Sequence, residues 1–315
     1  MLSELMVVNY HYIRDFFPSR GIYGIFPVNF VKQLGLIREN GFSFTSLREL
    51  NDAIINCDYS KLHTKSCLIT FDDGLRESYE IGFPLLEREG IDAAFFVSSA
   101  TTSGRRVLPV HKYHLIQSVL SDQEIAKKIS IVGMDAFPSS DIDARAQYPW
   151  DTLESARLKY FLNFKLSFSE KEVVIDDLFK ECGVGETKYA AELYLSKAQI
   201  LELARLGNLA SHAITHQPLA QLGQDEMEFE LHQSRSDLNL FAGNLIESVS
   251  YPFGGETAVN GQVIEAAKKA GYISGFTMQR GVNNLTDIIK NPLSIKRYDS
   301  NDIYGGKSDI MNRGG

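Results

Sequence analysis

The chain has 315 residues, of which 44% are apolar, so it can bury the core of one large α/β domain or of two smaller ones. Its formal net charge is −8 at pH 7, and no basic block or aromatic-interleaved run of lysine and arginine occurs. This composition argues against a surface for nucleic acids or anionic membranes and favours small or neutral partners.

Cysteine usage and the amino terminus predict a cellular compartment. The three cysteines, Cys57, Cys67 and Cys182, cannot all pair within one chain and lack metal-finger spacing. Residues 1–6 lead directly into a predicted strand without a basic region or a long apolar segment, and no apolar stretch reaches about 18 residues. We therefore predict a cytoplasmic protein without an integral membrane segment.

Strand-like and amphipathic segments alternate over the first hundred residues. The predicted strands cover residues 5–12, 66–71 and 93–97, and the predicted helices cover residues 28–39 and 75–89. Such alternation predicts βα units around a parallel sheet.

The segment 100–195 interrupts this rhythm. It contains predicted helices at residues 110–120, 153–164 and 170–182, and we interpret it as a helical insertion within a single domain spanning residues 1–315. The insertion is expected either to cap the mouth of the domain, which would turn an open groove into a pocket, or to serve as a packing extension or dimer surface.

After the insertion the alternation resumes. The predicted helices are 197–206, 225–241 and 262–270, and the predicted strands are 208–212, 248–251 and 272–277. Residues 305–315 are expected to form a mobile tail.

Two adjacent carboxylates follow the predicted strand at 66–71. Asp72 and Asp73 precede Gly74, which allows the backbone to turn sharply. Adjacent residues on an extended chain point in opposite directions, so one carboxylate can ligate a metal while the other faces a water. Taken alone, Asp-Asp-Gly is a common turn sequence and is more typical of structure than of catalysis.

About 140 residues later, residues 211–216 read Ser-His-Ala-Ile-Thr-His. His212 and His216 lie four apart, a spacing that suits one helical face, yet Pro218 and the strand-like residues before them favour a loop. A chance histidine pair is the alternative. In combination with the two carboxylates, the pair predicts a metal-dependent hydrolase, in which one carboxylate and two imidazoles hold the metal and the second carboxylate accepts a proton.

At these motifs the chain resembles the polysaccharide deacetylases of carbohydrate esterase family 4, the NodB-homology enzymes. The Thr-Phe-Asp-Asp-Gly run at 70–74 and the histidine pair are similar to the first two family motifs, and Ser250-Tyr-Pro-Phe-Gly is similar to the third. The resemblance covers roughly residues 6–100 and 196–298. It implies an α/β fold, a distorted (β/α)7 barrel, with the motifs at the carboxyl ends of its strands.

The resemblance also implies roles for single residues. Asp73, His212 and His216 would bind a divalent metal, commonly zinc, and Asp72 would be the general base. The backbone N–H of Phe253 would donate to the developing oxyanion, and Tyr251 and Pro252 would lie against the substrate. These roles agree with the chemistry of the residues, since a divalent metal acidifies water enough for a nearby carboxylate to take its proton.

Two positions depart from the family pattern. Ser250 stands where the family has an arginine that orients the base, so that contact is lost or supplied from elsewhere. Arg297 stands where many members have a histidine that acts as general acid, and we expect it to contact a substrate anion instead. The general acid is then either Asp72, returning its proton, or His11 at the end of the first predicted strand.

The leading functional hypothesis is removal of an N-acyl group, with acetyl first, from an amino sugar in a surface-polysaccharide or glycolipid precursor. The expected partner is therefore an amino sugar, free, nucleotide-linked or lipid-linked, and not a nucleic acid. One alternative is an N-deformylase of a formamido sugar, for which Arg297 would suit a phosphate-linked donor. The other is a catalytically weak sugar-binding barrel.

Overall fold

The computed structural model describes residues 2–131 and 141–308, and their packing separates two units. The first unit comprises Met1–Phe16, Gly24–Gly104 and Ala191–Gly315. The second comprises Phe17–Tyr23 and Arg105–Ala190, a range that lies inside the predicted insertion at 100–195 apart from its short first segment.

Parallel strands form the centre of the first unit. They are β1 (Glu4–Tyr10), β4 (Ser43–Phe44), β5 (Lys65–Phe71), β6 (Ala93–Val97), β7 (Leu209–Ser211), β8 (Ser248–Ser250), β9 (Ser274–Phe276) and β10 (Tyr298–Asp299). Within the described chain the order is β10-β1-β5-β6-β7-β8-β9, with β4 paired to β5 off this path. The longest pairing joins β1 to β5 with Val8 opposite Ile69.

The sheet curls into a barrel. Phe96 on β6 and Phe276 on β9 are separated by two strands, β7 and β8, in the sheet order, yet their ring centroids lie 5.3 Å apart, so this face is concave. Ile295 pairs with Phe276 of β9, and β10, which follows it, pairs with β1. One chain segment therefore links the two edges of the sheet, and the predicted (β/α)7 barrel is confirmed.

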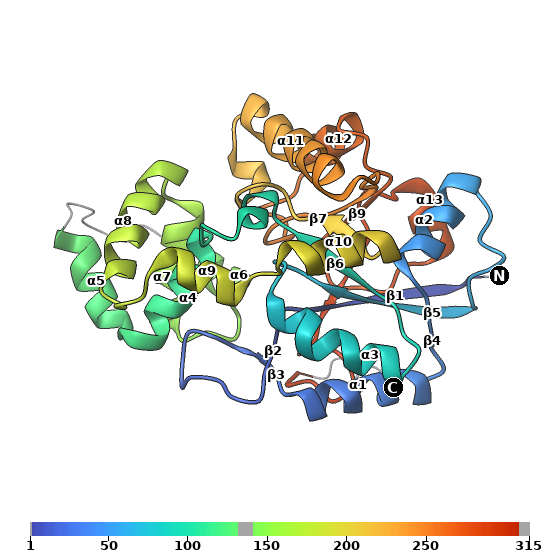
Figure 1. Ribbon diagram of the computed structural model, residues 1–315, viewed down its shortest axis with the longest axis horizontal. Helices are drawn as coiled ribbons and strands as arrows, with labels where there is room; N and C mark the ends of the chain where they lie inside the picture. The colour runs from blue at the N-terminus through green and yellow to red at the C-terminus, as the bar shows by residue number, and fades with distance from the viewer. Residues whose placement is uncertain (1, 132–140, 309–315) are drawn as a thin grey trace. The chain divides into compact units, whose positions relative to one another are not determined.

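Alternate strand residues divide the core between the two faces of the sheet, as the two-residue period of a strand requires. Leu5 and Val7 of β1 belong to the cluster that contains Phe96 and Phe276, whereas Met6, Val8 and Tyr10 belong to the other cluster. We call the cluster with Phe96 and Phe276 the inner cluster and the one with Met6, Val8 and Tyr10 the outer cluster. The helices that complete the outer cluster are α1 (Pro27–Glu39), α3 (Phe83–Arg88), α10 (Lys197–Leu206), α11 (Gln224–Ala242) and α12 (Gly261–Lys269). Figure 1 shows α11 and α12 side by side.

Helices α2 (Leu47–Asn56) and α13 (Leu285–Lys290) contribute to the inner cluster instead. Helix α2 begins with a capping box, in which the Ser46 hydroxyl accepts from the Glu49 amide at 3.1 Å and the Glu49 carboxylate accepts from the Ser46 amide at 2.9 Å. The predicted helix at 75–89 contains a π-helical stretch at Ser78–Gly82 ahead of α3. The remaining short elements are β2 (Tyr12–Ile13), its partner β3 (Gly24–Ile25), and the 3-10 turns Ser99–Ser103 and Leu219–Gln221.

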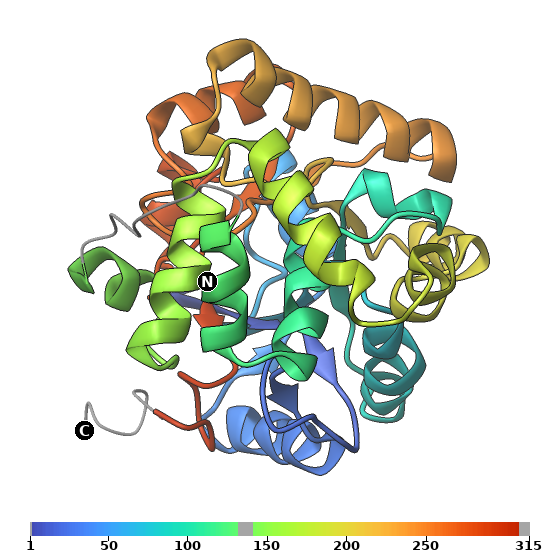
Figure 2. The ribbon, with the colours of Figure 1, turned by 90° about the vertical axis from the view of Figure 1, so that its left-hand side faces the viewer.

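Helices make up the second unit. They are α4 (Pro109–Val119), α5 (Asp122–Ile131), α6 (Asp141–Gln147), α7 (Leu153–Phe164), α8 (Phe168–Lys180) and most of α9 (Glu186–Leu193). Figure 2 shows α4 beside α8, and an apolar cluster that includes Ile116, Leu162 and Leu178 joins α4, α7 and α8. This unit therefore has a hydrophobic core of its own.

The predicted mobile tail at 305–315 lies outside the described residues from 309 onward. Ser308, the last described residue, donates to the Asn301 carbonyl at 2.8 Å and to Asp302 at 3.0 Å. No helix within residues 2–131 and 141–308 combines the length and the apolar character needed to cross a membrane.

Candidate active site

The site residues follow the carboxyl ends of neighbouring strands. Asp72 and Asp73 come directly after β5, His212 directly after β7, and Tyr251 directly after β8. Because the carboxyl ends of parallel strands meet at one edge of a barrel, residues distant in sequence converge there. Both histidines lie in the loop after β7, as predicted.

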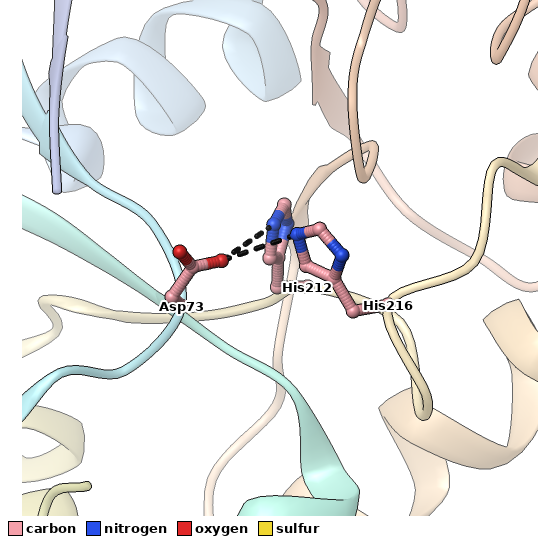
Figure 3. Close-up of side chains that lie close together, drawn as sticks. All are labelled: Asp73, His212 and His216. Atoms are coloured by element: carbon pink, nitrogen blue, oxygen red, sulfur yellow. Dashed lines mark ion pairs between the residues drawn. The ribbon is translucent and has the colours of Figure 1, made fainter. Parts of the chain in front are cut away.

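Asp73, His212 and His216 form a compact cluster of buried metal-ligating groups. Figure 3 shows one Asp73 oxygen facing both imidazole rings. Asp73 Oδ1 lies 3.4 Å from His212 Nε2 and 3.2 Å from His216 Nε2. A divalent ion bound tetrahedrally at about 2.1 Å needs donor atoms roughly 3.4 Å apart, so both distances fit such an ion.

The hydrogen bond on the far side of His212 fixes the chemistry of this cluster. His212 Nδ1 lies 2.7 Å from the Ser250 carbonyl oxygen, which can only accept, so Nδ1 carries a proton. In the neutral ring, Nε2 is then an acceptor that faces a carboxylate oxygen, another acceptor. That contact is favourable with a cation between the two atoms or a proton on the ring, and the donor set therefore fits a divalent metal.

The same conclusion follows from the pKa of His212. Burial by itself would lower this pKa, but the carboxylates of Asp72 and Asp73 raise it above its ordinary value. The cluster thus attracts positive charge, whether this is a proton or a metal ion.

A carboxylate outside the motifs holds the histidine loop. Glu230 of α11 is buried and accepts from the backbone amides of Ile214 and Thr215 at 2.8 and 3.0 Å, and also from the Thr215 hydroxyl. At the start of the loop, the His212 amide donates to the Val97 carbonyl at 2.9 Å. These contacts fix the backbone on which both imidazoles are carried.

Strained backbone conformations gather in these loops. Asp73, His216 and Phe253 have positive φ values of 74°, 58° and 62°, in the left-handed region that side chains other than glycine rarely adopt. Such strain persists where surrounding contacts enforce it and is typical of functional sites. Here it turns the Asp73 carboxylate toward the imidazoles while Asp72 takes a different direction.

The Asp72 carboxylate is held by a buried polar network. Arg297 Nη1 donates to Oδ1 at 2.9 Å and Nη2 donates to Oδ2 at 2.8 Å. Asn9 and Ser250 also donate to Oδ2, at 3.0 and 3.1 Å. Burial alone would raise the pKa of this carboxyl, but the charges of Arg297 and His212 and the hydrogen bonds from Arg297 together lower the pKa of Asp72 to about 2.

Two predicted substrate contacts are wrong. The Arg297 side chain is 0% exposed and its guanidinium is bonded to protein groups, so it cannot bind a substrate anion. Tyr251 is also fully buried, and its hydroxyl donates to the Leu293 carbonyl at 2.9 Å. Tyr251 directly follows β8 and Arg297 directly precedes β10, and both side chains point into the protein.

The other predicted residues lie close to the cluster. The Phe253 ring packs edge-on against the His216 ring with centroids 4.9 Å apart, so this side chain has a contact that the backbone role alone did not require. His11, half-buried between β1 and β2, is near enough for its charge to lower the pKa of Asp72. Pro252 is buried, and its contact with a substrate stays a prediction.

Sequence reasoning missed Asn9, Thr70 and Glu230. Thr70 lies within the first motif, and the Thr70 hydroxyl donates to the Asn9 side chain at 3.0 Å. A polar residue inside an apolar strand run was the available signal for both, since such a group needs a partner when buried. Glu230 gave no signal, because it sits in an ordinary amphipathic helix.

Comparison with known proteins gives a family match over part of the chain. A family model described as polysaccharide deacetylase matches residues 170–274, a range that contains both histidines and the Ser250 to Gly254 motif. Comparison with curated protein sequences gives no match.

Solved structures of similar fold span nearly the whole chain. The Streptococcus pyogenes deacetylase PplD, solved in complex with acetate, has a TM-score of 0.59 and 17% identity over 99% of this chain and 98% of its own. A de-N-acetylase from Aggregatibacter actinomycetemcomitans has a TM-score of 0.59 and 15% identity over 98% and 99% of the two chains. IcaB from Ammonifex degensii has a TM-score of 0.56 and 19% identity over 94% and 91%.

The structural likeness confirms the deacetylase-type barrel. The family match over residues 170–274 agrees with the resemblance to polysaccharide deacetylases that the sequence motifs carry.

Proposed function

We propose that the protein is a metal-dependent hydrolase that removes an N-acyl group, with acetyl as the first choice, from an amino sugar in a surface-polysaccharide or glycolipid precursor. The observation that carries this proposal is the cluster of Asp73, His212 and His216 next to a separately held carboxylate, Asp72. The deacetylases among the solved structures of similar fold support the reaction class.

The three clustered residues would hold the metal, for which zinc suits the two nitrogens and one carboxylate oxygen. When bound, a divalent metal supplies Lewis-acid polarisation of an amide carbonyl and acidifies water. His212 is prepared for ligation because the Ser250 carbonyl holds the proton on Nδ1 and leaves Nε2 directed at Asp73.

Asp72 would act as the base. Its Oδ2 accepts from Arg297, Asn9 and Ser250, whereas within the described residues Oδ1 accepts from Arg297. Oδ1 therefore has the larger remaining capacity to accept a proton from water. The backbone N–H of Phe253 would donate to the carbonyl oxygen as negative charge develops on it.

Two groups remain candidates for protonating the leaving amine. Asp72 can return the proton it has taken, which needs no further residue. His11 is the other candidate, because it follows β1 beside β5 and its charge acts on Asp72.

The decisive experiment is proton NMR of the metal-loaded protein with N-acetyl and N-formyl amino sugars, free and nucleotide-linked. We expect released acetate, and we expect Asp72→Asn to abolish its release. Formate in place of acetate would replace the acyl group in the proposal. Metal binding without release of either acid, on these and on lipid-linked sugars, would favour a sugar-binding barrel.

The geometry removes the specific support for the deformylase alternative. That alternative used Arg297 as a contact for a phosphate-linked donor, and the guanidinium is instead buried against Asp72. The cytoplasmic location stays a proposal, supported by the free thiols of Cys57, Cys67 and Cys182.

A further inference from the structure

We infer that Arg297 is the positioning residue for the Asp72 carboxylate. Arg297 can take this position because residue 250 has a small side chain. The inference rests on the proposed function, in which Asp72 is the base. It assigns to Arg297 a role that neither its place in the sequence nor its departure from the family pattern suggests.

The contact between the two side chains has the geometry that orients a carboxylate. Two parallel N–H···O bonds, at 2.9 and 2.8 Å, join the guanidinium edge to both Asp72 oxygens. A bidentate pair of this kind fixes the plane of the carboxylate as well as its position, which a lysine ammonium cannot do.

The guanidinium is itself held from several sides. Its Nε donates to the Thr277 carbonyl at 3.0 Å, and Nη1 donates to the Asn9 side chain at 3.1 Å. The Phe96 ring lies beneath it, with the guanidinium carbon 5.7 Å from the ring centroid. Because its neighbours come from several strands of the barrel, Arg297 transmits the rigidity of the barrel to the base.

Positions 250 and 297 compete for one space. The Ser250 hydroxyl lies 2.7 Å from Arg297 Nη2 and 3.1 Å from Asp72 Oδ2, so the guanidinium fills the volume directly in front of residue 250. A long side chain at 250 would overlap the guanidinium, while an arginine placed there alone could reach Asp72. The two positions are therefore alternatives for the same function.

The first test compares Arg297→Lys with Arg280→Lys, a matched control on an arginine that is 49% exposed and pairs with Asp302. For Arg297→Lys we expect kcat to fall about 100-fold, the cost of a base misplaced by about 1 Å. KM, and the zinc affinity measured by calorimetry, should stay within about threefold of the wild-type values, because the metal ligands are unchanged. Arg280→Lys should keep kcat.

The second test exchanges the two positions. Arg297→Ser should lose turnover, and Ser250→Arg should lower the melting temperature because two guanidinium groups compete for one space. The double variant Ser250→Arg/Arg297→Ser should turn over at least about tenfold faster than Arg297→Ser. Equal turnover in the double variant and in Arg297→Ser would overturn the inference.

The third test measures the melting temperature of metal-free variants and depends on neither metal binding nor turnover. In the metal-free protein, Arg297→Ser should lower the melting temperature less in an Asp72→Asn background than in the wild type, because the pair is already broken there. Equal losses would contradict the contact. Full activity of Arg297→Lys would overturn the positioning role while the proposed function stands, whereas a wild-type protein that hydrolyses no amide would overturn both.

Discussion

Asp72 and Asp73 are neighbours in the chain but have different expected roles, and single substitutions separate them. Asp73→Ala or His212→Ala should lose zinc and turnover together, whereas Asp72→Asn should keep zinc and lose turnover by at least about 100-fold. Metal content by mass spectrometry and acid release by NMR measure the two effects. Wild-type zinc stoichiometry in Asp73→Ala would refute the ligand assignment.

His11 decides the identity of the general acid. If His11 delivers the proton, His11→Gln should lower kcat by about 100-fold, because an amide side chain cannot release a proton near neutral pH. If Asp72 serves in both roles, the variant should keep a rate within a few-fold of wild type. The kcat of the variant, measured with saturating metal, distinguishes the two results.

The sequence indicated four of the central residues, because Asp72, Asp73, His212 and His216 lie in motifs whose spacing reflects their chemistry. It could not indicate what Arg297 contacts. The partner, Asp72, is 225 residues away, and the contact depends on how the barrel closes and not on any local pattern. Nor could it indicate that Tyr251, a predicted substrate contact, is fully buried, since the direction of a side chain after a strand depends on the turn that follows.

Among the elements, α11 supports the site through Glu230. Glu230→Gln keeps the shape of the side chain but weakens its hydrogen bonds to Ile214 and Thr215, so we expect zinc affinity to fall about 10- to 100-fold. Glu228→Gln on the same helix is the matched control, because Glu228 bonds Lys269 and Gln224 at the surface. Calorimetric titration with zinc compares the two variants. Similar affinities would show that zinc binding does not depend on the hydrogen bonds from the histidine loop to Glu230.

Helix α8 contains a lysine that destabilises the second unit at neutral pH. Lys171 is 4% exposed, and burial lowers its pKa to about 8 from an ordinary 10.5. The unfolded chain therefore binds more protons than the folded chain between pH 8 and 10.5, so stability rises with pH across this window. The penalty is fully present below about pH 8.

Lys171→Met should therefore stabilise the protein at pH 7, by an upper limit of about 3 kcal/mol, and by less at pH 10. Lys180→Met, on an exposed lysine of the same helix, should change stability little at either pH. Thermal unfolding at both pH values measures the difference. A gain that does not shrink at pH 10 would point to better packing and not to the removal of a charge.

Helices were more predictable than short elements. The predicted ranges 153–164 and 197–206 coincide with α7 and α10, since both helices begin directly after an N-cap serine or threonine. Helix α2 was missed although Ser46 and Glu49 form a capping box. Strands β7, β8 and β9 have three residues each, so their existence depends on pairing with neighbours and not on their own sequence.

For the molecule as a whole, metal binding should couple to stability. The three ligands come from the segments after β5 and β7, so an ion that binds the folded barrel and not the unfolded chain raises its melting temperature. At free zinc of about 100 times Kd the stabilisation is about 2.7 kcal/mol. We expect a chelator to reverse it and Asp73→Ala to abolish it, both measured by thermal unfolding with and without zinc.

The barrel itself could be predicted from alternating strands and helices together with the family resemblance. Its closure could not, because the closing segment pairs through Ile295 on one edge and through β10 on the other, with few residues in each pairing. The independent core of the helical unit could be anticipated only in part, as an interruption of the alternation.

The distance in sequence between Asp72 and its guanidinium partner has a consequence for synthesis. Ribosomes make the Asp72 carboxylate 225 residues before Arg297, and Asp73, His212 and His216 also precede that arginine. A nascent barrel therefore carries these acidic and imidazole groups before the positively charged Arg297 has been synthesised. The segment that closes the sheet also brings Arg297, which neutralises the charge of Asp72. Because this segment is synthesised late, the burial of Asp72 is delayed until the barrel can be completed.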